Sequence, residues 1–169
     1  MTSQPAKNIQ DPGRKEYLHG GQIVATKEPT QITSILGSCI AVCLWDPRLG
    51  IGGMNHYLLP FGHRHEDLKS ARYGNVAIPM LIEQLVDLGA NVKRLQAKVF
   101  GGASSINPGK PGVHHVGARN AEAAQELLLE RRIPIVSHDT GGANGRKVIF
   151  HTNTGEAWVR LIQANKPEK

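Results

Sequence analysis

Glycine and proline divide the chain into many short segments, and this division constrains its fold more than any other feature. Nineteen glycines and ten prolines are spread over 169 residues, mostly in short clusters that punctuate local structure. The segments between these clusters are rich in Val and Ile, which is typical of short strands. We predict eight strands, at residues 22–25, 31–36, 40–45, 51–59, 95–100, 133–138, 147–152 and 157–162.

Two longer segments, residues 75–88 and 121–131, have the apolar spacing of helices instead. Gly89 is a stop signal for the first, and Asn120 is expected to be the N-cap of the second. The apolar stripes consist of Ile78, Leu81, Leu85 and Leu88 in the first segment, and of Ala121, Ala124 and Leu128 in the second. Many strands with two helices predict an α+β fold built from packed layers.

The length of the chain fits a single domain. Residues 1–16 hold almost no apolar side chains, so we expect a flexible leader there and one domain over residues 17–169. The leader lacks the apolar region of a signal peptide, and the longest uncharged stretch, residues 31–45, is too short and too polar to span a bilayer. We therefore expect no membrane insertion and, with only two cysteines, a reducing cytoplasmic location.

A cysteine and a histidine flank a predicted hairpin. The sequence Asp46-Pro-Arg-Leu-Gly50 is a turn signal between the strands at 40–45 and 51–59. If these strands pair antiparallel about that turn, opposite residues have numbers that sum to about 95 or 96, and Cys39 faces position 56 or 57. His56 then lies beside Cys39 on one face of the sheet, whereas a slip of one residue would separate the two.

This pairing suits nucleophilic chemistry. A free cysteine is mostly protonated at neutral pH, but an adjacent imidazole can accept its proton and form a thiolate–imidazolium pair. The thiolate can attack a carbonyl, and the imidazolium can return the proton to a leaving amine. Thr33, six residues before Cys39, is a candidate to orient the ring of His56 through its hydroxyl. Gly37 and Ser38 suit a tight bend whose N–H groups could stabilise an oxyanion.

Each of these residues also has a purely structural interpretation. A cysteine in an apolar segment is more often a buried small hydrophobe than a nucleophile, and we assign Cys43 to packing because no glycine bend adjoins it. Thr33 has a high strand propensity, and His56 fits a polar strand end. The juxtaposition of Cys39 with His56 is what favours the functional interpretation.

Other candidate sites are weaker. The pairs His63/His65 and His114/His115 have spacings that zinc sites use, but no Cys-x-x-Cys or His-Glu-x-x-His accompanies them, so we expect exposed loop histidines and no metal. The glycine clusters match neither a phosphate loop nor a dinucleotide fingerprint, so we expect no cofactor. A net charge of +6 suits an acidic partner, while scattered basic residues without interleaved aromatics argue against nucleic acid.

One resemblance covers nearly the whole chain. The segment Leu36-Gly-Ser-Cys-Ile-Ala-Val-Cys-Leu-Trp-Asp46, followed by Gly52-Gly-Met-Asn-His-Tyr-Leu-Leu-Pro60, resembles the chemoreceptor glutamine deamidase family, CheD. Weaker similarities follow in the same order at Tyr73, Lys98–Ala103, Gly117–Asn120, Asp139–Gly142 and Gly145–Val148. The resemblance runs from Gly21 to Ile162 and implies a single-domain, three-layer α/β/β sandwich.

The resemblance also implies a function. It implies a cytoplasmic hydrolase that converts specific glutamines of methyl-accepting chemotaxis receptors to glutamate and releases ammonia, without a cofactor. The implied site has Cys39 as nucleophile, His56 as general base and acid, and Thr33 as the residue that orients the ring. Hydrolysis of receptor methyl esters and binding of the CheC phosphatase are further implications. The alternative is a non-catalytic module that docks a CheC-type phosphatase or receptors.

Overall fold

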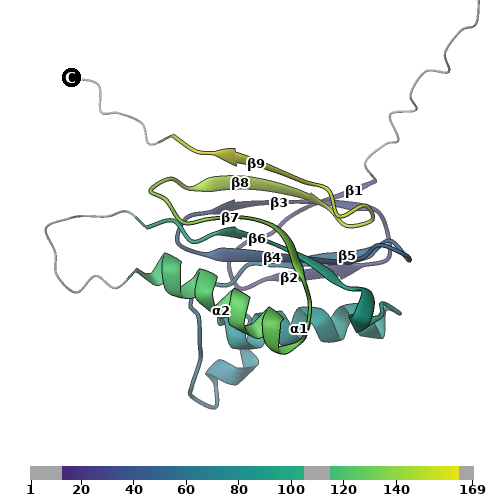
Figure 1. The fold of residues 1–169 in the computed structure, drawn as a ribbon, viewed down its shortest axis with the longest axis horizontal. Helices are drawn as coiled ribbons and strands as arrows, with labels where there is room; N and C mark the ends of the chain where they lie inside the picture. The colour runs from purple at the N-terminus through teal and green to yellow at the C-terminus, as the bar shows by residue number, and fades with distance from the viewer. Residues whose placement is uncertain (1–12, 105–114, 164–169) are drawn as a thin grey trace, which may run out of the picture.

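Three layers make up the computed structural model, which describes residues 13–104 and 115–163. A four-stranded sheet has the order β1-β3-β8-β9, and a five-stranded sheet has the order β2-β5-β4-β6-β7. Both α-helices cover one face of the five-stranded sheet, and the four-stranded sheet lies on the opposite side (Figure 1). The predicted α+β class and the implied α/β/β sandwich are thereby confirmed.

The strands are β1 (Arg14–Tyr17), β2 (Ile23–Thr26), β3 (Thr30–Leu36), β4 (Ile40–Asp46), β5 (Ile51–Asn55), β6 (Gln96–Gly101), β7 (Ile135–Thr140), β8 (Arg146–His151) and β9 (Ala157–Leu161). The helices are α1 (Gly74–Asp87) and α2 (Val116–Glu130), with 3-10 turns η1 (Asp67–Lys69) and η2 (Val92–Arg94). All eight strands expected from the sequence are present. The segment expected at 51–59 ends at Asn55, because the chain beyond it leaves the regular ladder.

Strand β4 lies at the centre of the molecule and is buried along its whole length. Successive side chains of a strand point to opposite faces, so Val42 and Leu44 pack toward the helices while Ala41 and Cys43 pack toward the other sheet. Two hydrophobic cores result, one on each side of the five-stranded sheet. Cys43 is fully buried in the core between the sheets, which confirms its assignment to packing.

The helices bury the predicted stripes against the five-stranded sheet. Leu81 and Leu85 of α1, and Ala124 and Leu128 of α2, have no exposed surface. The start of α2 differs from the prediction, because Asn120 lies inside the helix and is completely buried. A local cap signal could not show that the side chain is held by tertiary hydrogen bonds.

The N-terminal boundary also differs from the prediction. Arg14, Lys15 and Glu16 were expected in the leader, but they belong to β1, which pairs in parallel with β3 at the edge of the four-stranded sheet. An edge strand can be stabilised by backbone pairing while its side chains stay in water. The polar composition of β1 therefore gave no hydrophobic pattern from which a strand could be predicted. Residues 1–12 lie outside the described part of the chain.

The hairpin of β4 and β5 has a different register from the predicted one. Asp46 pairs with Ile51 and Cys43 with Met54, because the connecting turn occupies four residues and closes at Gly50, whose φ of 65° is left-handed. In this register Cys39 lies opposite position 58. His56 is therefore two residues from the opposite position, on the same face as Cys39.

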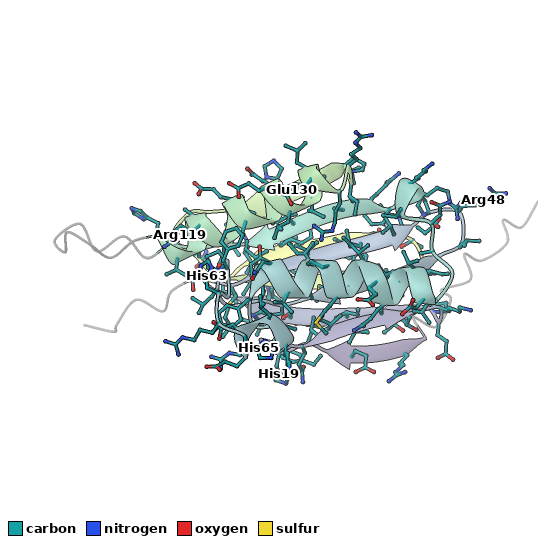
Figure 2. All side chains as sticks on the ribbon, turned by 90° about the horizontal axis from the view of Figure 1, so that it is seen from below. His19, Arg48, His63, His65, Arg119 and Glu130 are labelled. Atoms are coloured by element: carbon teal, nitrogen blue, oxygen red, sulfur yellow. The ribbon has the colours of Figure 1, made fainter. Side chains whose placement is uncertain are left out.

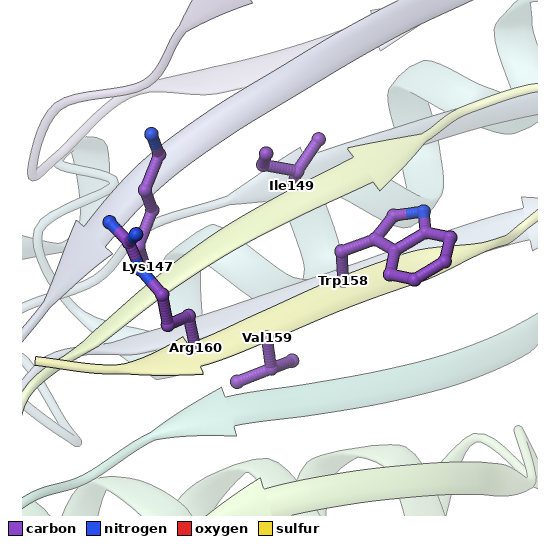
Figure 3. A pocket seen from close by; sticks show the side chains of 5 residues that line it. All are labelled: Lys147, Ile149, Trp158, Val159 and Arg160. Carbon is purple, nitrogen blue, oxygen red and sulfur yellow. The ribbon is translucent and has the colours of Figure 1, made fainter.

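In residues 13–104 and 115–163, no helix is long and apolar enough to cross a membrane. A cavity of about 270 Å³ lies on the four-stranded sheet (Figure 3). Its lining residues are Lys147, Ile149, Trp158, Val159 and Arg160. Cys39 is not among these residues, because it packs against the core between the two sheets.

Candidate active site

Cys39 occupies an exposed bend between β3 and β4. Gly37 and Ser38 are exposed, and Cys39 is partly buried. The segment that follows β6 holds this bend by two backbone hydrogen bonds: Ala103 donates to the carbonyl of Gly37 (2.9 Å), and Gly102 donates to that of Cys39 (2.8 Å). The bend therefore presents the thiol from a backbone that is fixed on one side.

Asn120 fixes the bend from the helical layer. Its side-chain Nδ2 donates to the carbonyl of Ser38 and to that of Leu58, both at 2.9 Å, while its main-chain carbonyl accepts from the hydroxyl of Tyr57 (2.6 Å). The Ser38 carbonyl and the Cys39 N–H belong to one planar peptide group and point in opposite directions. Holding the carbonyl toward α2 directs the N–H toward the other side of the sheet, which is the side that Cys39 faces. This N–H is suited to stabilising an oxyanion near the sulfur.

His56 follows β5 directly and is only 6% exposed. Its backbone is anchored to the segment before β2, since its N–H donates to Gln22 (3.2 Å) and its carbonyl accepts from Gly21 (2.7 Å). Its Nδ1 lies 2.9 Å from the hydroxyl of Ser34 in β3. The same hydroxyl donates to the carbonyl of Leu18, at 2.6 Å.

Cys39 and His56 reach the space between the two sheets from neighbouring segments. Ile40 and Tyr57, the residues that follow them, exchange backbone hydrogen bonds of 3.1 and 2.9 Å. This pair extends the hairpin ladder beyond β5 and places Cys39 diagonally across from His56. Diagonal neighbours on one face are ~7–8 Å apart at Cα, a separation that a histidine side chain can span. The predicted juxtaposition is therefore reached in a register whose paired residue numbers sum to 97, not to the predicted 95 or 96.

The hydroxyl that contacts the ring belongs to Ser34 and not to the neighbouring Thr33, the predicted orienting residue. Adjacent residues of a strand face opposite sides, and Ser34 is fully buried toward the ring while Thr33 is partly exposed. Thr33 contributes through its main chain, because its carbonyl accepts the N–H of Leu18 (2.9 Å).

Burial determines the protonation states of Cys39 and His56. It raises the pKa of the Cys39 thiol above its ordinary 9.0, with the residue's own N–H acting in the opposite direction. It lowers the pKa of His56 below 6.5; the Leu18 carbonyl opposes this shift and the charge of His19 adds to it. Both directions favour a neutral thiol beside a neutral imidazole. This result differs from the predicted ion pair, because desolvation penalises both charged forms.

Figure 2 shows His63 and Arg119 toward one end of the molecule and Arg48 at the other. Arg48 belongs to the turn after β4, whereas Cys39 precedes that strand, so His63 and Arg119 lie toward the end with Cys39.

The described residues contain no group of three or more His, Cys, Asp or Glu side chains that could hold a metal ion. His63, His65 and His115 are exposed, and His114 lies outside the described residues.

Sequence reasoning missed Ser34 and Asn120. The signal for Ser34 was present, because β3 carries two adjacent hydroxyl residues and strand alternation sends only one of them toward the ring. Asn120 had no comparable local signal, since its two acceptors, Ser38 and Leu58, lie more than sixty residues away in the chain.

Comparison with known proteins agrees with this architecture. Residues 58–161 match the family described as "CheD chemotactic sensory transduction". A protein of Anaeromyxobacter dehalogenans named "Probable chemoreceptor glutamine deamidase CheD 1" is 53% identical over 146 residues, which cover 86% of this chain and 84% of the relative.

More distant relatives carry the same family name. A CheD protein of Sulfurimonas denitrificans is 42% identical over 88% of this chain and 95% of its own length. One from Caulobacter vibrioides is 42% identical over 94% of this chain and 85% of its own length. These matches confirm the resemblance drawn from the sequence, and the chain belongs to the CheD family.

Proposed function

We propose that this chain deamidates glutamine side chains of chemotaxis receptors, with Cys39 as nucleophile and His56 as general base and acid. The observation that carries the proposal is the position of Cys39, on an exposed bend and on the same face as a buried histidine whose Nδ1 is already engaged. The names of the relatives supply the substrate, a chemoreceptor glutamine.

The proposed reaction has two steps. His56 takes the proton of the Cys39 thiol as the sulfur attacks the amide carbon, so that a C–S bond forms and an oxyanion develops beside the Cys39 N–H. The imidazolium then protonates the departing nitrogen, the C–N bond breaks, and ammonia leaves a thioester. Water then attacks the thioester with His56 as base, the C–S bond breaks, and the imidazolium returns its proton to the sulfur, so that glutamate is formed and the free thiol is regenerated.

The neutral forms of Cys39 and His56 before substrate binds are compatible with this order of reaction steps. A neutral imidazole is the form that can accept a proton, and burial keeps His56 in that form near neutral pH. The thiolate then forms only when substrate is bound. Thr33 has a supporting role in this scheme, because its carbonyl helps to place Leu18 next to Ser34.

We extend the proposal to three properties that the family resemblance implies. The same acyl chemistry would hydrolyse glutamyl methyl esters, whose alkoxide is an easier leaving group than an amide nitrogen. A CheC-type phosphatase would be a binding partner. The cytoplasm would be the place of action, where the resemblance puts the substrate.

Mass spectrometry of a purified receptor cytoplasmic fragment tests the main proposal. Incubation with the wild-type protein should produce, at discrete glutamines, the mass increase that accompanies replacement of an amide NH₂ by OH. Cys39→Ala should abolish this change without altering the thermal unfolding midpoint by more than a few degrees. Binding of the fragment by both proteins, with no deamidation by the wild type, would instead favour a non-catalytic docking module.

A further inference from the structure

We propose that Ser34 is the positioning residue that sets the tautomer of His56; this inference rests on the proposed function of the Cys39/His56 site. The hydroxyl of Ser34 has two close polar neighbours, the carbonyl of Leu18 at 2.6 Å and Nδ1 of His56 at 2.9 Å. All three groups are buried, so water does not compete for these contacts.

Counting protons fixes the direction of both hydrogen bonds. A serine hydroxyl has one proton, and a carbonyl oxygen can only accept. An O–O distance of 2.6 Å to Leu18 therefore requires the Ser34 proton to lie on that contact. The hydroxyl oxygen can then only accept from Nδ1, so Nδ1 of His56 carries a hydrogen. In the neutral ring, the lone pair that remains is on Nε2.

This tautomer is the one that the proposed reaction needs. Nε2 is left as the nitrogen that can take the Cys39 proton, and Nδ1 keeps its hydrogen when the ring becomes positively charged. The contact between Ser34 and His56 therefore persists through proton transfer, and no group must reorient during the reaction. An orienter with a fixed hydrogen-bond direction is what a general base requires.

The fold holds Ser34 and Leu18 in place. Ser34 lies in β3, between β1 and β8, and pairs with Val148. Leu18 continues β1, is 1% exposed, and donates its N–H to the carbonyl of Thr33. The side chain of Ser34 thus contacts the ring, while the backbone of Thr33 holds the N–H of Leu18, whose carbonyl receives the serine proton.

Nuclear magnetic resonance of the wild-type protein with ¹⁵N-labelled histidine tests this inference without turnover. His56→Gln identifies the His56 signals by their loss. At a pH above the pKa of His56, the ring should carry its hydrogen on Nδ1. A ring with its hydrogen on Nε2 would overturn the inference, whatever the deamidation assay shows.

Matched variants test the consequence for catalysis. Ser34→Ala should lower kcat about threefold to tenfold, the value of one neutral hydrogen bond, with little change in KM and a mixed His56 tautomer. Thr30→Val removes another buried hydroxyl of β3, one that donates to the Glu28 carbonyl, and should leave kcat unchanged. An unchanged kcat and tautomer in a folded Ser34→Ala protein, or a greater kcat loss in Thr33→Val than in Ser34→Ala, would refute the role of Ser34.

Discussion

Replacing Asn120 by alanine should loosen the bend that presents Cys39. The change removes two buried hydrogen bonds, to the carbonyls of Ser38 and Leu58. Each loss leaves a carbonyl poorly satisfied and costs ~1.5 kcal/mol, while alanine returns ~0.6 kcal/mol of helix propensity. The net loss of unfolding free energy is therefore about 2 kcal/mol, which corresponds to a drop of about 4–8 °C in Tm for a domain of this size.

The catalytic effect of Asn120→Ala should exceed its effect on stability. Without Nδ2, the peptide between Ser38 and Cys39 can rotate, and both the sulfur and the Cys39 N–H lose their fixed direction. Small displacements of reacting groups cost up to ~100-fold in rate, so we expect kcat/KM for receptor deamidation to fall at least ~10-fold at a temperature well below Tm.

Arg94→Ala supplies the matched control. Arg94 pairs with Asp46 at the far end of β4 through contacts of 3.0 and 2.7 Å. Removing it should lower the free energy of unfolding, because the buried carboxylate of Asp46 loses its partner. Deamidation by Arg94→Ala should match the wild type. Equal activity losses in this variant and in Asn120→Ala would refute the reasoning, since stability alone would then account for both.

Three further predictions concern ionisable groups. The rate of deamidation should decrease at acid pH with a pKa below 6.5, because only neutral His56 accepts a proton. Iodoacetamide labelling of Cys39 should have its midpoint above pH 9.0. A labelling plateau at acid pH would indicate a preformed ion pair. Cys43→Ala should retain deamidation activity and lose ~1 kcal/mol of stability, and a loss of activity in the folded variant would contradict its assignment to packing. Burial would raise the pKa of Asp46, but Arg94 and two backbone N–H groups lower it from 3.8 to about 2. Calorimetry should therefore show the free energy of unfolding falling as the pH drops through this range, and a flat profile would contradict the pairing.

Most of the architecture was predictable from local patterns, because both helices and every strand except β1 carry a signal of their own. The stripe of Leu81 and Leu85 follows from helical periodicity, and both residues are fully buried. Strand β1 was not predicted, because its side chains are polar and the strand is formed by backbone pairing with β3. Backbone pairing at a sheet edge leaves no hydrophobic pattern in the sequence.

The site could be predicted from the sequence only in part. The predicted register that sums to 95 places Cys39 and His56 on one face, and so does the observed sum of 97, because a shift of two residues preserves the face. The other predicted sum, 96, would have put the two residues on opposite faces. The four-residue turn, which pairs Asp46 with Ile51, explains the error. The choice between Thr33 and Ser34 depends on which side of β3 is buried, and that is decided by packing between the sheets.

The formation of a thioester on Cys39 is tested most directly by adding hydroxylamine during deamidation of a receptor cytoplasmic fragment. Hydroxylamine intercepts thioesters, so the wild-type protein should yield hydroxamate in place of part of the glutamate at the same positions, and Cys39→Ala should yield neither product. Glutamate formed by Cys39→Ala at the wild-type rate, with no hydroxamate from either protein, would contradict the account.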